Sequence, residues 1–123
     1  MASLYYTSTL ICLATTPKHI SIGIHHVHKA IDQIPAIPES ARGKALAPTT
    51  WDFSVGVLGI LSLLNYKWAT KGGPRTWEES AVIYTWMCTG AVIGWRYFRM
   101  KMYPGLGFLW LAPALSVLGM WVG

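Results

Sequence analysis

Three apolar segments of nearly equal length, each bracketed by aromatic residues, constrain most strongly what this chain can fold into. The bracketing pairs are Trp51 and Trp68, Trp77 and Trp95, and Tyr103 and Trp121, which lie 17, 18 and 18 residues apart. At a helical rise of about 1.5 Å per residue, each pair spans about 26–27 Å, close to the hydrocarbon thickness of a bilayer. Because Trp and Tyr favour the headgroup level, the pattern predicts three transmembrane helices, over about residues 51–68, 77–95 and 103–122.

The composition supports membrane residence. Of the 123 residues, 53% are hydrophobic and only 12% are charged, against roughly 25% charged in ordinary soluble domains. A soluble domain of this size needs abundant polar surface, which this chain lacks. The predicted fold class is therefore an all-α integral membrane protein. The net charge of +5 comes from cations next to apolar segments, which indicates contact with anionic phospholipids rather than nucleic acid.

Local signals mark the ends of the predicted helices. Thr76 followed by Glu79 fits a capping box at the start of the second helix, and Gly72-Gly73-Pro74 predicts the turn before it. Pro113 lies inside the third segment and should kink it.

The stretch from Trp95 to Tyr103 combines cations with aromatics and predicts a short turn at the membrane surface. The side chains expected at the lipid headgroups are Trp51, Trp68, Lys71, Trp77, Trp95, Arg96, Arg99, Lys101, Tyr103 and Trp121.

The cations also predict an orientation. With three crossings, one side of the membrane has seven cations: Lys18, Lys29, Arg42, Lys44, Arg96, Arg99 and Lys101. The other side has three: Lys67, Lys71 and Arg75. The positive-inside bias then places the amino terminus in the cytoplasm, or in the matrix of a mitochondrion, and the carboxyl terminus on the opposite side.

Residues 1–50 are expected to form an extramembrane arm, separate from a transmembrane domain over residues 51–123. Residues 1–14 are uncharged and would lie along a partner or enter the membrane partway. An apolar stripe recurring every three or four residues from Ile20 to Ile34 predicts a short amphipathic helix, with an extended strand as the alternative at its start. Residues 35–48 are expected to form an extended, proline-rich linker.

The sequence offers little chemistry. His25 and His28 have a spacing compatible with a metal site, but a solvated or headgroup-facing histidine cluster explains them better. Cys12 and Cys88 are far apart in apolar segments and indicate two small buried hydrophobes.

The three predicted spans place no ionisable residue inside the membrane. This absence argues against a pump, a proton channel or a haem site. We therefore expect no enzyme activity, no catalytic residue, no metal and no cofactor apart from structural phospholipids.

The predicted helices carry small residues one turn apart, which let helices approach closely in lipid. These are Gly56 and Gly59 in the first segment, Gly90 and Gly94 in the second, and Ala112 and Ser116 in the third. Their predicted use is packing against other subunits.

Residues 92–107, "VIGWRYFRMKMYPGLG", resemble part of the transmembrane-14 family, which includes the plastid fatty-acid-export proteins. The matching residues, in order, are Gly94, Arg96, Tyr97, Lys101, Pro104 and Gly105. The family has four membrane spans where this sequence predicts three, and it has Met-Pro where this chain has Met-Tyr-Pro. The resemblance implies a small lipid or fatty-acid carrier.

Two functions follow from the sequence. The first is a non-catalytic accessory subunit of a large membrane complex, packing at its periphery and contributing to its assembly or stability. A respiratory-chain or ATP synthase complex of the mitochondrial inner membrane is the expected location, with thylakoid and endoplasmic reticulum as alternatives. The second is the lipid carrier implied by the resemblance.

Overall fold

The computed structural model describes residues 1–123, and 87% of the chain is helical with no strand, which confirms the all-α fold class. The elements are α1 (Ala2–Ile22), the π-helical η1 (Gly23–Val27), α2 (His28–Asp32), α3 (Pro38–Lys71), α4 (Trp77–Arg99), the 3₁₀-helical η2 (Tyr103–Gly105), the π-helical η3 (Gly107–Leu111) and α5 (Ala112–Trp121).

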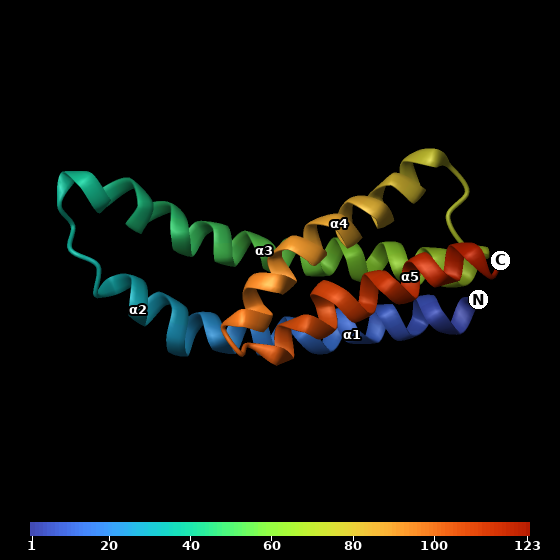
Figure 1. The fold of residues 1–123 in the computed structure, drawn as a ribbon, viewed down its shortest axis with the longest axis horizontal. Coiled ribbons are helices and arrows are strands. Elements are labelled where there is room, and N and C mark those ends of the chain that lie inside the picture. The colour runs from blue at the N-terminus through green and yellow to red at the C-terminus, as the bar shows by residue number, and fades with distance from the viewer.

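The helices form an elongated bundle (Figure 1). α1, η1 and α2 run antiparallel to α3 in one long hairpin, whose closed end extends beyond the other helices. α4 then returns diagonally, and α5 runs back beside α1, so that the two chain termini lie at the same end. α1 contacts both α3 and α5, whereas α4 is held chiefly by η3 and α5, and its backbone stands apart from that of α3, which it meets through side chains.

The amino-terminal region differs from the arm that the sequence predicts. α1 packs into the bundle, and Tyr5, Ser8 and Cys12 on one of its faces are completely buried. These side chains recur every three or four residues, so a helix brings them to one side, where α3 and α5 cover them. Residues 1–50 are therefore not separate from the other helices.

The expected linker over residues 35–48 is mostly helical. α3 begins at Pro38, where a proline is tolerated because the first turn needs no amide hydrogen, and it continues through Pro48. Lys44 Nζ donates to the carbonyl oxygens of Asp32 and Ile34, which joins α3 to the end of α2. The amphipathic segment from Ile20 is helical as far as Asp32, as the end of α1, η1 and α2.

Two helices are long and apolar enough to cross a membrane: Pro38–Lys71 and the continuous run Tyr103–Trp121. They contain the first and third predicted segments. The second segment forms α4, but its Trp, Tyr, Thr and Gly residues give it less mean hydropathy. Thr76 caps α4 by accepting from the Glu79 amide at 3.3 Å. The Glu79 carboxylate instead accepts from the Arg75 amide at 2.7 Å, so only half of the capping box forms.

Two small apolar clusters make up the core. The first contains Tyr5 of α1, Trp68 and Ala69 of α3, and Ile83 of α4. The second contains Cys12, Leu61, Trp86 and Ala112. Each cluster draws on α1, so the bundle depends on the helix that the sequence analysis placed outside it.

Candidate functional site

A groove of about 1110 Å³ lies between α3 and α4. One face of each helix forms a wall, and side chains from α1 and from η2 and η3 complete the lining. Of the 25 lining residues 15 are hydrophobic, and only Glu78 and His19 can carry a charge near neutral pH, so the groove suits hydrocarbon. Its size slightly exceeds the roughly 300–1,000 Å³ of common small-molecule sites.

The groove exists because α4 is held against η3 rather than α3. Gly90 of α4 lies against the Leu109 carbonyl, so closely that an added Cβ would be 2.1 Å from that oxygen. Pro113 has no amide hydrogen, so this carbonyl lacks the partner that a regular helix would supply four residues later. The contact with the Gly90 backbone brings a weak Cα–H donor near that oxygen instead.

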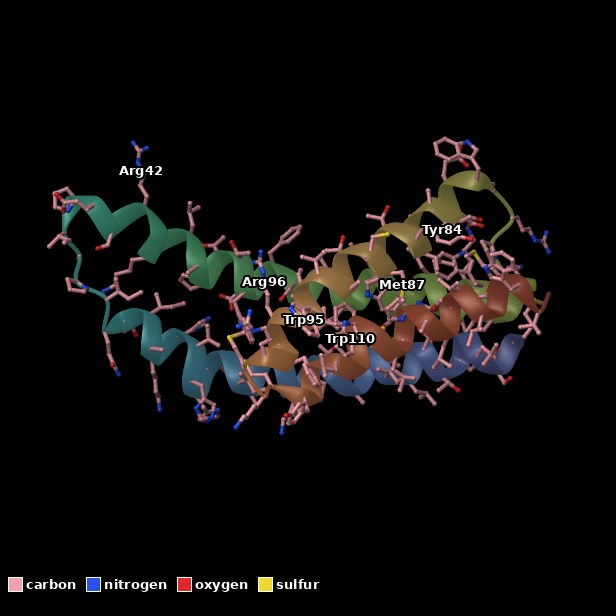
Figure 2. The ribbon with its side chains drawn as sticks, viewed as in Figure 1. Arg42, Tyr84, Met87, Trp95, Arg96 and Trp110 are labelled. Carbon is pink, nitrogen blue, oxygen red and sulfur yellow. The ribbon has the colours of Figure 1, made fainter.

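Trp110 fixes the same contact from the other side. Its indole Nε1 donates to the Gly90 carbonyl at 3.1 Å, and its ring lies against Gly94, where an added Cβ would be 2.0 Å from Nε1 (Figure 2). Gly90 and Gly94, one turn apart, thus admit the Leu109 backbone and the Trp110 indole, respectively. The sequence predicts that this pair packs against other subunits, whereas in the structure both glycines pack within the chain.

A buried polar cluster joins α1, α3 and α5. Ser116 Oγ donates to Asn65 Oδ1 at 2.7 Å and lies 3.1 Å from Ser8 Oγ. Ser8 Oγ donates to the Ala112 carbonyl at 3.0 Å. Ser8, Asn65, Ala112 and Ser116 are all completely buried. Hydrogen bonds of this kind between helices stabilise and align helix bundles in lipid.

The glycines of α3 behave differently. Gly56 and Gly59 have no neighbouring atom within 4 Å of an added Cβ, so they face open space and pack against nothing within the chain.

At one end of the groove, a stacked pair joins α1 to α3. The rings of His19 and Trp51 lie 4.1 Å apart at an angle of 8°, and His19 Nε2 is 2.6 Å from Ser54 Oγ and 3.0 Å from the Trp51 carbonyl oxygen. Farther along the hairpin, His28 Nε2 lies 2.9 Å from Asp52 Oδ1. The histidines therefore serve separate contacts, and no group of three or more His, Cys, Asp or Glu side chains converges.

At the other end, the turn between α3 and α4 is held by charged groups. Glu79 binds Lys67 Nζ, and Arg75 Nη2 donates to the Lys71 carbonyl at 2.9 Å. These contacts fix where α4 starts and therefore how far it stands from α3.

The predicted interface residues fall into two groups. Four of the aromatic residues are more than half exposed: Trp77 (76%), Trp95 (56%), Tyr103 (55%) and Trp121 (77%). The four predicted cations are exposed as well: Lys71, Arg96, Arg99 and Lys101. Trp51 is half-buried in the groove wall. Trp68 is completely buried, with its ring centroid 6.1 Å from that of Tyr5, because α1 covers the end of α3. It does not face the lipid headgroups.

The sequence analysis did not identify the groove. One signal for it is the spacing of Ala81, Thr85 and Thr89, which are small and four residues apart, and which line the α4 wall. Trp86 lines the groove too, and its buried indole N–H has no partner.

Comparisons of the chain with protein-family models, with curated proteins and with solved structures each found no match. The resemblance of residues 92–107 to the transmembrane-14 family therefore stays a prediction.

Proposed function

We propose that this chain is an integral membrane protein in which α1, α3, α4 and the helical run Tyr103–Trp121 all cross the bilayer. α1 and α4 have 21 and 23 residues, which correspond to about 32 and 34 Å, and they lie alongside the two helices that are apolar enough to span. Leu10 and Leu13 of α1 and Val92 of α4 are more than half exposed, as expected of side chains that face lipid.

A fourth crossing changes the proposed topology. Both termini then lie on the same side of the membrane as Lys67, Lys71 and Arg75, and the seven other cations lie on the opposite side. The positive-inside bias places the seven-cation face in the cytoplasm or matrix. The amino terminus accordingly faces away from that compartment, opposite to the orientation expected from three crossings.

Within the membrane we propose a non-catalytic accessory role in a larger complex. The observation that supports it is the small core, because only 21 of 123 residues are buried and α1, α3, α4 and α5 each present large apolar side chains outward. Such a surface suits packing against neighbouring subunits. The mitochondrial inner membrane, with a respiratory-chain or ATP synthase complex, remains the proposed location.

Blue-native electrophoresis tests this role. Native membranes are extracted with a mild detergent, and the chain is followed across the gel by mass spectrometry. We expect it to migrate with a large assembly at constant stoichiometry, which would also identify the complex and the compartment. Migration as a monomer or a small homo-oligomer would overturn the accessory role.

The groove favours a second candidate, a small lipid or fatty-acid carrier. A carrier needs a space between its helices, and the α3–α4 groove provides one with a mainly apolar lining. The purified chain in liposomes would then accelerate fatty-acid transfer, and Thr85→Trp, which places an indole in the groove and narrows it, would reduce the acceleration. Unchanged transfer in that variant would exclude this function.

A further inference from the structure

A second, smaller cavity lies at the turn between α3 and α4, at the end of the bundle where both termini lie (Figure 1). Its volume is about 320 Å³, near the lower limit of the roughly 300–1,000 Å³ of common small-molecule sites. Unlike the α3–α4 groove, it has no hydrophobic residue in its lining. The lining residues are Lys67, Lys71, Gly73, Arg75, Thr76 and Glu79. Three cations and one carboxylate make the cavity strongly positive.

Contacts within the chain bring these four charged residues together. The Glu79 carboxylate is bound by Lys67 Nζ through one oxygen and accepts from the Arg75 amide through the other, at 2.7 Å. Arg75 Nη2 in turn donates to the carbonyl oxygen of Lys71 at 2.9 Å. Lys67 and Lys71 are one turn apart on α3, so their side chains leave the same face of the helix. The three cations therefore surround one small space.

The local sequence explains why Arg75 is held there. Lys71 is the last residue of α3, so no later helical amide can reach its carbonyl oxygen. Gly72 and Gly73 have φ values of 79° and 100°, which glycine adopts without strain, and they reverse the chain. The reversal brings the Arg75 side chain back over the end of α3, where it donates to that carbonyl.

The cavity retains unused hydrogen-bond donors. Lys71 Nζ makes no hydrogen bond or ion pair within the chain, and the Arg75 guanidinium makes only its bond to the Lys71 carbonyl. The Thr76 hydroxyl accepts from the Glu79 amide at 3.3 Å, which leaves its own hydrogen free to donate. An anion in the cavity would therefore meet an ammonium, a guanidinium and a hydroxyl group.

This set of donors favours a phosphate group. A guanidinium binds two oxygens of a phosphate through parallel hydrogen bonds, and lysine binds phosphate as a point charge. A planar carboxylate has only two oxygens, which one guanidinium already occupies. A phosphate has further oxygens for the ammonium and the hydroxyl group.

We propose that this cavity binds a phosphate group, held by Lys71, Arg75 and the Thr76 hydroxyl. The phosphate belongs either to the headgroup of an anionic phospholipid or to a soluble phosphorylated molecule, since the same donors recognise both. In the proposed membrane arrangement, Trp77, which follows Thr76 and is 76% exposed, places the cavity at headgroup depth. The site itself rests on the cavity and its contacts, and it does not depend on the accessory role.

Two measurements on the purified full chain in mild detergent test the proposal. Isothermal titration calorimetry at low ionic strength measures the binding of inorganic phosphate, and native mass spectrometry compares the retention of phosphatidylglycerol and phosphatidylcholine. We expect one phosphate or one phosphatidylglycerol per chain. Lys71→Gln should weaken the binding of that ligand about tenfold, because it removes one charge-assisted hydrogen bond.

Matched variants separate the site from general charge effects. Lys71→Gln should fold normally, since Lys71 Nζ has no partner within the chain, and the thermal-unfolding midpoint checks this. Lys29→Gln removes an equally exposed helical lysine from α2 and should leave binding unchanged. Glu79→Gln keeps an oxygen that accepts from the Arg75 amide but removes the competing negative charge, so it should tighten binding. Weaker binding in a folded Glu79→Gln variant would contradict the proposal.

The two measurements also identify the source of the phosphate. Binding of inorganic phosphate without retained lipid indicates a soluble ligand, whereas preferential retention of phosphatidylglycerol indicates a headgroup, and either result supports the site. The proposal is overturned if neither ligand binds, if phosphatidylcholine is retained equally and inorganic phosphate does not bind, or if binding is the same in Lys71→Gln as in the unchanged chain.

Discussion

The carbonyl oxygen of Leu109 lies against Gly90 so closely that a Cβ added to Gly90 would be 2.1 Å from it. This contact joins the turn that precedes Pro113 to the middle of α4. It holds α4 on the η3 side of the bundle, and both residues of the contact line the groove.

Gly90→Ala should therefore destabilise the bundle, although alanine favours helices more than glycine does. The extra methyl group must displace backbone, which costs about 1–3 kcal/mol of unfolding free energy or more. Reversible unfolding in detergent measures this value. Gly56→Ala is the matched control, since its methyl group would meet no atom within 4 Å, and it should be neutral or slightly stabilising. Equal effects at the two glycines would contradict the close contact.

The hydrogen bond between Ser116 and Asn65 should stabilise the packing of α5 on α3. A double-mutant cycle with Ser116→Ala and Asn65→Ala isolates this pair. We expect a coupling free energy of about 0.6 kcal/mol, the average for such bonds in membrane helices, and no more than about 1.7 kcal/mol. Thr7→Ala is the control, because the Thr7 hydroxyl is exposed and bonds only to Ser3 in its own helix. A coupling of zero would show that the cluster does not contribute to stability.

Two tryptophans that share a predicted interfacial role should respond differently to truncation. Trp68→Ala should lower the unfolding free energy by about 3–5 kcal/mol, because the ring is completely buried between α1, α3 and α4. Trp77→Ala should change it by no more than about 0.5 kcal/mol, since Trp77 is 76% exposed. The same denaturant titration in detergent measures both variants, and the reverse order would place Trp68 at the lipid surface.

The position of α1 makes a topological prediction. If α1 crosses the membrane, short tags fused to the amino and carboxyl termini should be digested from the same side of sealed membrane vesicles. A tag inserted at the α2–α3 turn, near Gln33, should be protected under those conditions. Protection of one terminus and digestion of the other would support the three-crossing arrangement instead.

Much of the helical layout was predictable because it depends on local signals. The capping residue Thr76 and the turn at Gly72-Gly73 act within one or two helical turns, so the end of α3 and the start of α4 follow from neighbouring residues. The packing stripe of α1 was missed because Ser8 and Cys12 are small and only weakly apolar. Hydropathy gives such residues little weight, although small side chains are favoured where helices meet.

The sequence by itself determined that the chain is helical, rich in apolar surface and strongly asymmetric in its cations, because these properties are set by composition and by short-range spacing. Only the tertiary structure decided that α1 belongs to the bundle, that Trp68 is buried, and that Gly90 and Gly94 pack against Leu109 and Trp110 of the same chain. It also decided that α3 and α4 stand apart and leave a groove. These features depend on which faces meet across long sequence separations, and no local pattern specifies the partner of a face.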